Sequence, residues 1–215
     1  MRKTPFVVGE FYHIYNRGTD HREIVGDFFD RQRFLQSMIE FNVTEPIGSI
    51  YAQQFNPLST PTTKWKQKLV NIVAYCLNPN HFHFILEEVS EKGIEKFMQK
   101  LGGGYTRYFN EKNHRTGVLF QGKFKSVHID TDEYLLHVSA YVNLNDRIHK
   151  IPRGSSCSSW DEYMGNNKGE DICSKDIILE RFNNKKEYQK FTEDATQETL
   201  RRREEDKQFA ELLLE

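Results

Sequence analysis

Hydrophobic and polar positions follow two periods along the chain, and these periods predict alternating strands and helices. Segments with the aromatic and β-branched content typical of strands are 6–16, 69–77, 81–86 and the strand-rich stretch 117–129. Apolar residues spaced three and four apart predict helices over 30–41, 94–109 and 132–147. The resulting order, β-α-ββ-α-β-α, predicts the α+β class, with an antiparallel sheet on one side and helices packed on it from the other.

Turn and cap residues mark where several of these elements end. Asn78-Pro79-Asn80 separates two apolar strands and predicts a hairpin. The glycines at 102–104 weaken the second helix locally and predict a kink or close packing there. Asp130, followed three residues later by Glu133, predicts an N-cap and capping box for the third helix.

The chain length of 215 residues allows one ordinary domain with a core plus an extension. We expect one domain over 1–152 and a mostly helical, charged extension over 153–215. Residues 42–64 are loop-like, around a possible short strand near Ile50 and Tyr51.

Composition favours a cytoplasmic protein with reduced thiols. The mean hydropathy is −0.72, no apolar run approaches the roughly 20 residues that a membrane helix needs, and the N-terminus lacks the apolar region of a signal peptide. Cys76, Cys157 and Cys173 are odd in number and widely spaced, so they indicate neither a disulfide framework nor a paired-cysteine metal site.

Charge is balanced overall but uneven along the chain. The formal net charge of −1 does not by itself indicate a nucleic-acid partner. The stretch from Arg115 to Lys125, however, contains three basic residues and no acid, and a local basic surface is what a phosphate backbone requires.

His81 and His83 are a candidate pair of metal ligands. Side chains alternate along a strand, so two histidines separated by one residue lie on the same face, while Phe82 between them points to the core. Two adjacent imidazoles can bind one divalent ion. The alternative is a pair of surface or hydrogen-bonded histidines in a hairpin, and spacing alone does not exclude it.

Tyr141 and Asn145 lie four residues apart in the helix predicted over 132–147, and therefore on one face, about 6 Å apart. A tyrosine nucleophile and an amide oxygen can thus serve one metal site. A divalent ion that holds a phosphate offsets the poor nucleophilicity of a phenol whose ordinary pKa is about 10. The alternative is a tyrosine that only packs against the core.

Taken together, these motifs resemble those of the HUH single-tyrosine transposases, and of their REP-associated branch in particular. The matching segments, in order and over most of residues 6–192, are Pro79–His83, Tyr105–Asn110, Gly117–Ser126, Asp132–Leu136, Tyr141–Asn145 and Ser158–Gly165. The resemblance implies a ferredoxin-like, RRM-like HUH fold. Residues from Gln197 onward have no recognised counterpart.

The resemblance also implies roles for individual residues. His81 and His83 match the histidine ligands of Mg²⁺ or Mn²⁺, Asn145 matches the third ligand, and Tyr141 matches the nucleophile that forms a 5′-phosphotyrosine link and leaves a free 3′-hydroxyl. Single-stranded or hairpin DNA is the implied substrate, and a homodimer the implied assembly. Asp146 stands where the family usually has proline, and this departure could lengthen the helix.

Cationic and aromatic residues that could contact DNA phosphates and bases form a larger set. They are Arg17, Arg107, Arg115, Lys123, Lys125, Phe120 and Phe124. The alternative for any one of them is a solvated basic strand edge, which also discourages aggregation. The run 201–207 mixes both signs of charge and predicts a solvated helix.

Metal-assisted transesterification of a DNA phosphodiester by Tyr141 is therefore the leading functional hypothesis. One rival is a non-catalytic, domesticated DNA-hairpin binder that keeps the fold without turnover. Another is a metal-dependent hydrolase unrelated to DNA, which would use a water nucleophile and give Tyr141 no role.

Overall fold

The computed structural model describes residues 5–48, 50, 67–167, 169 and 171–212. Its centre is a five-stranded sheet in the order β4-β1-β3-β2-β5, and every pairing is antiparallel. The strands are β1 (Phe11–Arg17), β2 (Val70–Leu77), β3 (His81–Glu88), β4 (Lys125–Ile129) and β5 (Cys157–Ser158). The predicted β2–β3 hairpin is confirmed, and so is a first strand, which begins at Phe11 rather than at residue 6.

The hairpin forms because its turn satisfies its own backbone. The Asn78 amide donates to the carbonyl of His81 at 2.9 Å, and β2 and β3 then pair along their length. Both strands lie in the interior of the sheet, and every residue of β2 except Asn71 is buried, which explains the continuous apolar run of β2.

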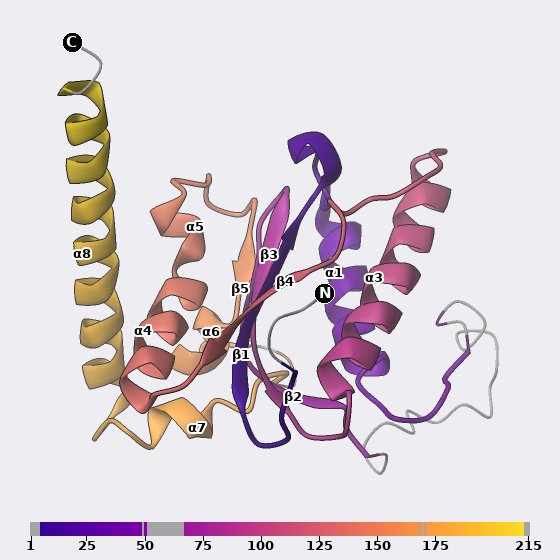
Figure 1. Cartoon of the computed structure of the whole chain (residues 1–215), viewed down its shortest axis with the longest axis horizontal. Coiled ribbons are helices and arrows are strands. Elements are labelled where there is room, and N and C mark those ends of the chain that lie inside the picture. The colour runs from indigo at the N-terminus through magenta and orange to yellow at the C-terminus, as the bar shows by residue number, and fades with distance from the viewer. Residues whose placement is uncertain (1–4, 49, 51–66, 168, 170, 213–215) are drawn as a thin grey trace.

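Helices cover both faces of the sheet, rather than one (Figure 1). The elements α1 (Phe28–Glu40) and α3 (Gly93–Lys112) lie on one face, where Phe34, Phe84 and Tyr105 form an aromatic core. The other face carries α4 (Asp132–Asn143), α5 (Asn145–Ile148) and α8 (Lys185–Leu212), with α8 packed along α4.

Shorter elements complete the fold. They are the 3-10 turn η1 (Thr19–His21), α6 (Trp160–Met164) and α7 (Asp176–Leu179). The buried Tyr163 donates to the carbonyl of Val73 at 2.9 Å, so the segment after 152 packs on β2. The division of the chain at 152 stays a prediction.

Within residues 117–131, two local predictions were wrong. Only Lys125–Ile129 of the stretch 117–129 is a strand, because Gly117 and Gly122 adopt positive φ and hold the preceding residues in a loop. The N-cap of α4 is Thr131, whose side chain accepts from the Tyr134 amide at 3.2 Å, and not Asp130.

Other local predictions have simpler outcomes. Close packing at the glycines is confirmed at Gly104, where an added Cβ would meet the Phe41 ring at 2.5 Å. The predicted strand near Ile50 and Tyr51 falls largely outside the described residues, and Ile50 itself is helical. All three cysteines are free, and none of the helices in the described chain is long and apolar enough to cross a membrane.

Candidate active site

The histidine pair lies on the face of β3 that α4 covers. The ring centroids of His81 and His83 are 5.2 Å apart at an interplanar angle of 89°, and Phe82 packs on the opposite face against Phe34. The predicted alternation along this strand is therefore confirmed. The antiparallel register of β1 places Tyr15 directly across from His83.

Tyr141 reaches this pair from α4. Its ring stands edge-on to His83, with a centroid distance of 5.5 Å and an angle of 89°, and it is half-buried. Its hydroxyl-bearing ring therefore lies next to the histidines while part of it stays open to solvent. Although β3 and α4 are distant in the sequence, α4 packs on β2 and β3, and this packing brings Tyr141 beside the histidines.

Asn145 lies beside His81 rather than on the same continuous helix as Tyr141. The helix predicted over 132–147 breaks at Leu144 (φ −112°, ψ 26°), and Asn145 begins α5. Its buried Oδ1 is 3.3 Å from Nε2 of His81. The break thus directs Asn145 to one histidine and Tyr141 to the other, and Asp146 has not lengthened the helix.

Two asparagines of the turn fix the orientation of His81. Oδ1 of Asn80 lies 2.7 Å from Nδ1 of His81, and because an amide oxygen only accepts, Nδ1 carries the proton. Nε2 therefore holds the lone pair. The amide nitrogen of the fully buried Asn78 donates to Oδ1 of Asn145 at 2.8 Å and lies 2.8 Å from Nε2 of His81.

Burial keeps the central histidines neutral. Removal from water lowers the pKa of His13 and of His81 to about 4 each. For His83, burial and then the neighbouring His13 and His81 lower the pKa to about 2. Neutral imidazoles are the form that binds metal ions, so the lowered pKa values of His81 and His83 suit both to the predicted role of ligands at neutral pH.

We expect the protein to lose stability as the pH falls from about 6.5 toward 4. The unfolded chain protonates these histidines near pH 6.5 while the folded chain does not, so the unfolded state binds more protons in this window. The free energy of unfolding should fall by up to about 1.4 kcal/mol per pH unit for each such histidine. Urea unfolding at pH 7, 6 and 5 measures this slope, and a His13→Gln variant should show a shallower one; equal slopes would contradict the argument.

Two histidines and an amide oxygen fit a divalent ion. Neighbouring donors on an octahedral ion with bonds of about 2.1 Å lie roughly 3 Å apart, and His81 Nε2 and Asn145 Oδ1 are separated by 3.3 Å. An ion at His81 would replace the hydrogen bond from Asn78. Within the described residues, no group of three or more His, Cys, Asp or Glu side chains could hold a metal ion, and the candidate set here therefore includes the amide oxygen of Asn145.

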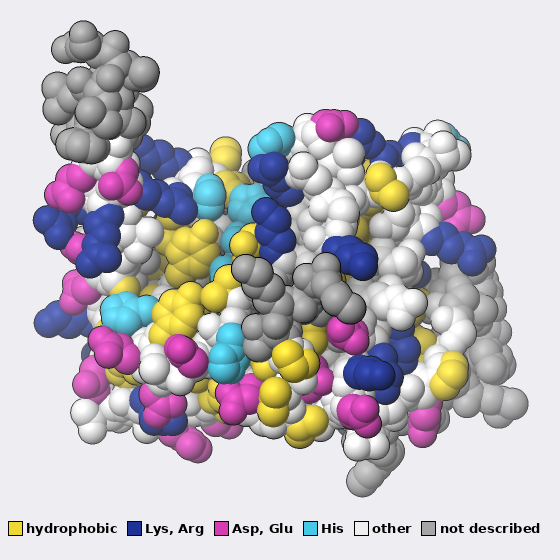
Figure 2. All heavy atoms as spheres, viewed as in Figure 1, with side chains coloured by type: hydrophobic (Ala, Val, Ile, Leu, Met, Phe, Trp, Pro, Cys, Tyr) yellow, Lys and Arg dark blue, Asp and Glu magenta, His cyan; other side chains and the backbone are white. Residues whose placement is uncertain are grey.

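A cavity of about 760 Å³ opens onto the histidines and Tyr141. Figure 2 shows histidine side chains gathered on this face with lysine and arginine side chains on either side of them. Arg17 and Lys125, both predicted DNA contacts, line this cavity together with Tyr15 and His149. A basic, partly aromatic opening therefore leads to the candidate nucleophile.

A second cavity, of about 1220 Å³, adjoins the first through Tyr15, Asn16 and Lys125. The predicted contacts that line it are Lys123, Lys125, Phe120 and Phe124. Five of the seven predicted DNA contacts thus line these two adjoining cavities.

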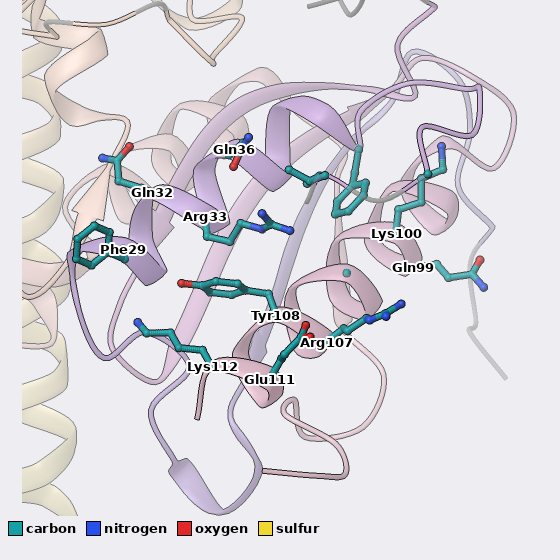
Figure 3. Close-up of a pocket in the computed structure, with 14 residues that line it drawn as sticks. Phe29, Gln32, Arg33, Gln36, Gln99, Lys100, Arg107, Tyr108, Glu111 and Lys112 are labelled. Carbon is teal, nitrogen blue, oxygen red and sulfur yellow. The ribbon is translucent and has the colours of Figure 1, made fainter. Parts of the chain in front are cut away.

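The other two predicted contacts lie apart from the histidines. Arg107 projects from α3 toward a separate pocket between α1 and α3, with Arg33 and Tyr108 (Figure 3). Arg115 donates to Oδ1 of Asn110 at 2.8 Å and to the carbonyl of Val118, so it holds the loop that follows α3.

Sequence reasoning missed several residues of the site. His13 lies 2.9 Å from His83 through ring nitrogens, and the His149 ring is 4.9 Å from that of His81. The alternation along β1 could have placed His13, Tyr15 and Arg17 on one face, but not beside β3. Arg201 and Arg202 pair with Glu198, as expected for a solvated helix. The pKa of His149 is lowered by burial and then by the positive charge of Arg203.

Comparisons with known proteins agree with the sequence motifs. No curated protein matches the chain. Among solved structures, a REP-associated tyrosine transposase bound to a REP hairpin aligns with a TM-score of 0.51 and 12% identity, over 82% of this chain and 92% of that one. At this identity the likeness concerns the fold, and it confirms the predicted fold class. A family model described as an IS200-like transposase matches residues 58–145. The segment that contains His81, His83, Tyr141 and Asn145 therefore matches the IS200-like transposase family, as its motifs predicted.

Proposed function

We propose that this protein is a metal-dependent, single-tyrosine DNA transposase that nicks and rejoins single-stranded or hairpin DNA. The observation that carries the proposal is that His81, His83 and Tyr141 line one cavity, with Tyr141 next to His83 and the buried Asn145 next to His81. The match of this segment to the IS200-like transposases gives it a reaction class.

In the proposed reaction, the phenolic oxygen of Tyr141 attacks the phosphorus of the scissile phosphodiester. The bond from phosphorus to the 3′ oxygen breaks, the phenol proton passes by way of water to the departing 3′ oxygen, and the products are a 5′-phosphotyrosine link and a free 3′-hydroxyl. Mg²⁺ or Mn²⁺ bound by His81, His83 and Asn145 would offset the charge of the phosphate and orient it. Asn78 and Asn80 hold Asn145 and His81 in place.

The proposed partner is single-stranded or hairpin DNA in the cytoplasm. The solved structure with a similar fold is bound to a REP hairpin, and a REP-associated role is the form of the proposal closest to it. Lysine, arginine and aromatic side chains around the two adjoining cavities supply the phosphate and base contacts that such DNA needs. A homodimer is a further part of the proposal.

The direct test incubates the protein with labelled single-stranded DNA from the flanks of its own gene, with Mn²⁺ or with EDTA. A denaturing gel then shows whether a covalent protein–DNA adduct forms. We expect an adduct with Mn²⁺ and none with EDTA. Binding without an adduct, across a panel of flanking hairpins, would instead support a domesticated hairpin binder, and the absence of any binding would contradict the proposal.

Lys125→Gln should weaken DNA binding at all sequences tested. Lys125 lines both adjoining cavities, so its charge is placed to neutralise a phosphate. Loss of one phosphate contact should reduce the slope of log K against log salt by about 0.7 for a single strand. Fluorescence anisotropy over a salt series measures this slope.

Arg107→Gln is the matched control, because Arg107 faces the pocket between α1 and α3. It should leave the salt slope unchanged. An equal reduction in both variants would show that DNA also reaches the α1–α3 face.

A further inference from the structure

One of the two ring nitrogens of His83 is hydrogen-bonded to His13. Nε2 of His13 and Nδ1 of His83 are 2.9 Å apart, and the two rings stack with centroids 5.1 Å apart. Between two neutral imidazoles, one nitrogen must donate and the other accept. The direction of this hydrogen bond therefore decides which nitrogen of His83 keeps its lone pair. His13 precedes residues 58–145, so it lies outside the segment that matches the family.

The fold holds His13 firmly beside His83. β1 is an interior strand, paired with β3 on one side and β4 on the other. Tyr15 lies directly across from His83, which makes His13 its diagonal neighbour on the same face. The Tyr15 ring also contacts both imidazoles, at centroid distances of 5.1 Å from His13 and 5.7 Å from His83. The two histidines are thus packed as a pair.

His81 shows what such a partner does. The Oδ1 of Asn80 accepts the proton on Nδ1 of His81, which leaves the lone pair on Nε2. Metal-binding histidines commonly donate their second ring nitrogen to an acceptor in this way, which fixes both tautomer and ring orientation.

We propose that His13 is a positioning residue that does for His83 what Asn80 does for His81. Nε2 of His13 accepts the Nδ1 proton of His83, so the lone pair of His83 lies on Nε2, available to the cavity it lines with Tyr141. If His13 donated instead, Nε2 of His83 would carry a proton and could not bind an ion. The inference rests on the proposed function, because it is the ion that requires this tautomer.

Two readouts test the inference. Long-range proton–nitrogen NMR spectra of ¹⁵N-histidine-labelled protein distinguish the protonated nitrogen of His83 from the one with the lone pair. Titration calorimetry measures the affinity for Mn²⁺. We expect the proton on Nδ1 of His83 in the wild type, and a roughly 10–100-fold weaker Mn²⁺ affinity in His13→Leu, which removes the acceptor.

His13→Gln supplies a side-chain oxygen that can accept the same proton, so it should restore much of the lost affinity. His128→Leu is the control. His128 lies on the edge strand β4, where it is exposed and hydrogen-bonds to Glu10, so its replacement should leave Mn²⁺ binding unchanged. The inference would be overturned if His13→Leu bound Mn²⁺ as tightly as the wild type does, or if Nε2 of His83 carried the proton in the wild type.

The two proposals fail in different ways. A wild-type protein that binds no Mn²⁺ would contradict the proposed metal chemistry, and the NMR spectrum would still decide the direction of the His13–His83 bond. Were His13→Leu to fail to fold, the wild-type spectrum together with His13→Gln would decide the inference.

Discussion

Tyr141→Phe should abolish the covalent protein–DNA adduct while leaving DNA binding near the wild-type level. The substitution keeps the aromatic ring that packs edge-on to His83 and His13, and it removes only the oxygen that would attack phosphorus. Because Tyr141 is half-buried, we expect stability to change by no more than about 0.5 kcal/mol. The denaturing gel used for the wild type measures the adduct, and anisotropy measures binding.

Tyr134→Phe is the matched control for this experiment. Tyr134 lies on the same helix, two turns earlier, and is 38% exposed. It should retain the adduct in full. Loss of the adduct in Tyr134→Phe with its survival in Tyr141→Phe would contradict the assignment of the nucleophile. DNA cleavage by Tyr141→Phe without an adduct would indicate a water nucleophile, and thus the metal-dependent hydrolase.

The parts of the site that could be predicted are those that local periodicity determines. The alternation of a strand places His81 and His83 on one face whatever the rest of the fold does. Tyr141 was predicted on a helix, and α4 carries it. Asn145 lies beside His81, but the single helix predicted over 132–147 was wrong. The break at Leu144 depends on how the chain after α4 packs, which periodicity does not report.

The parts that could not be predicted depend on contacts between distant segments. His13 meets His83 only because β1 pairs with β3 across 70 residues of sequence. Arg107 and Lys125 are both basic residues that the sequence makes candidate DNA contacts, yet α3 and β4 direct them to different cavities. Asn78 belongs to a recognised turn, but its bond to Asn145 spans 67 residues and forms only in the folded chain.

His83→Leu should weaken Mn²⁺ binding at least about 100-fold, which corresponds to about 2.7 kcal/mol. His83 is only 8% exposed and is neutral at pH 7, so leucine fills much of the same apolar space without leaving a buried charge unpaired. The loss should therefore appear in metal affinity and in adduct formation, and not in the folded fraction. Titration calorimetry of the purified variant measures the affinity, and thermal unfolding monitors the fold.

The strongest competing ligand assignment is His149, whose ring lies 4.9 Å from that of His81 at the rim of the same cavity. His149→Leu tests it directly, since it removes an imidazole of equal chemistry from the same cavity. If the ion is held by His81, His83 and Asn145, His149→Leu should bind Mn²⁺ nearly as well as the wild type. A loss equal to that of His83→Leu would mean that His149 belongs to the ligand set. In that case the ion would lie closer to α5, on the His81 side of the cavity, and Tyr141, which contacts His83, would be less well placed to attack a phosphate bound to it.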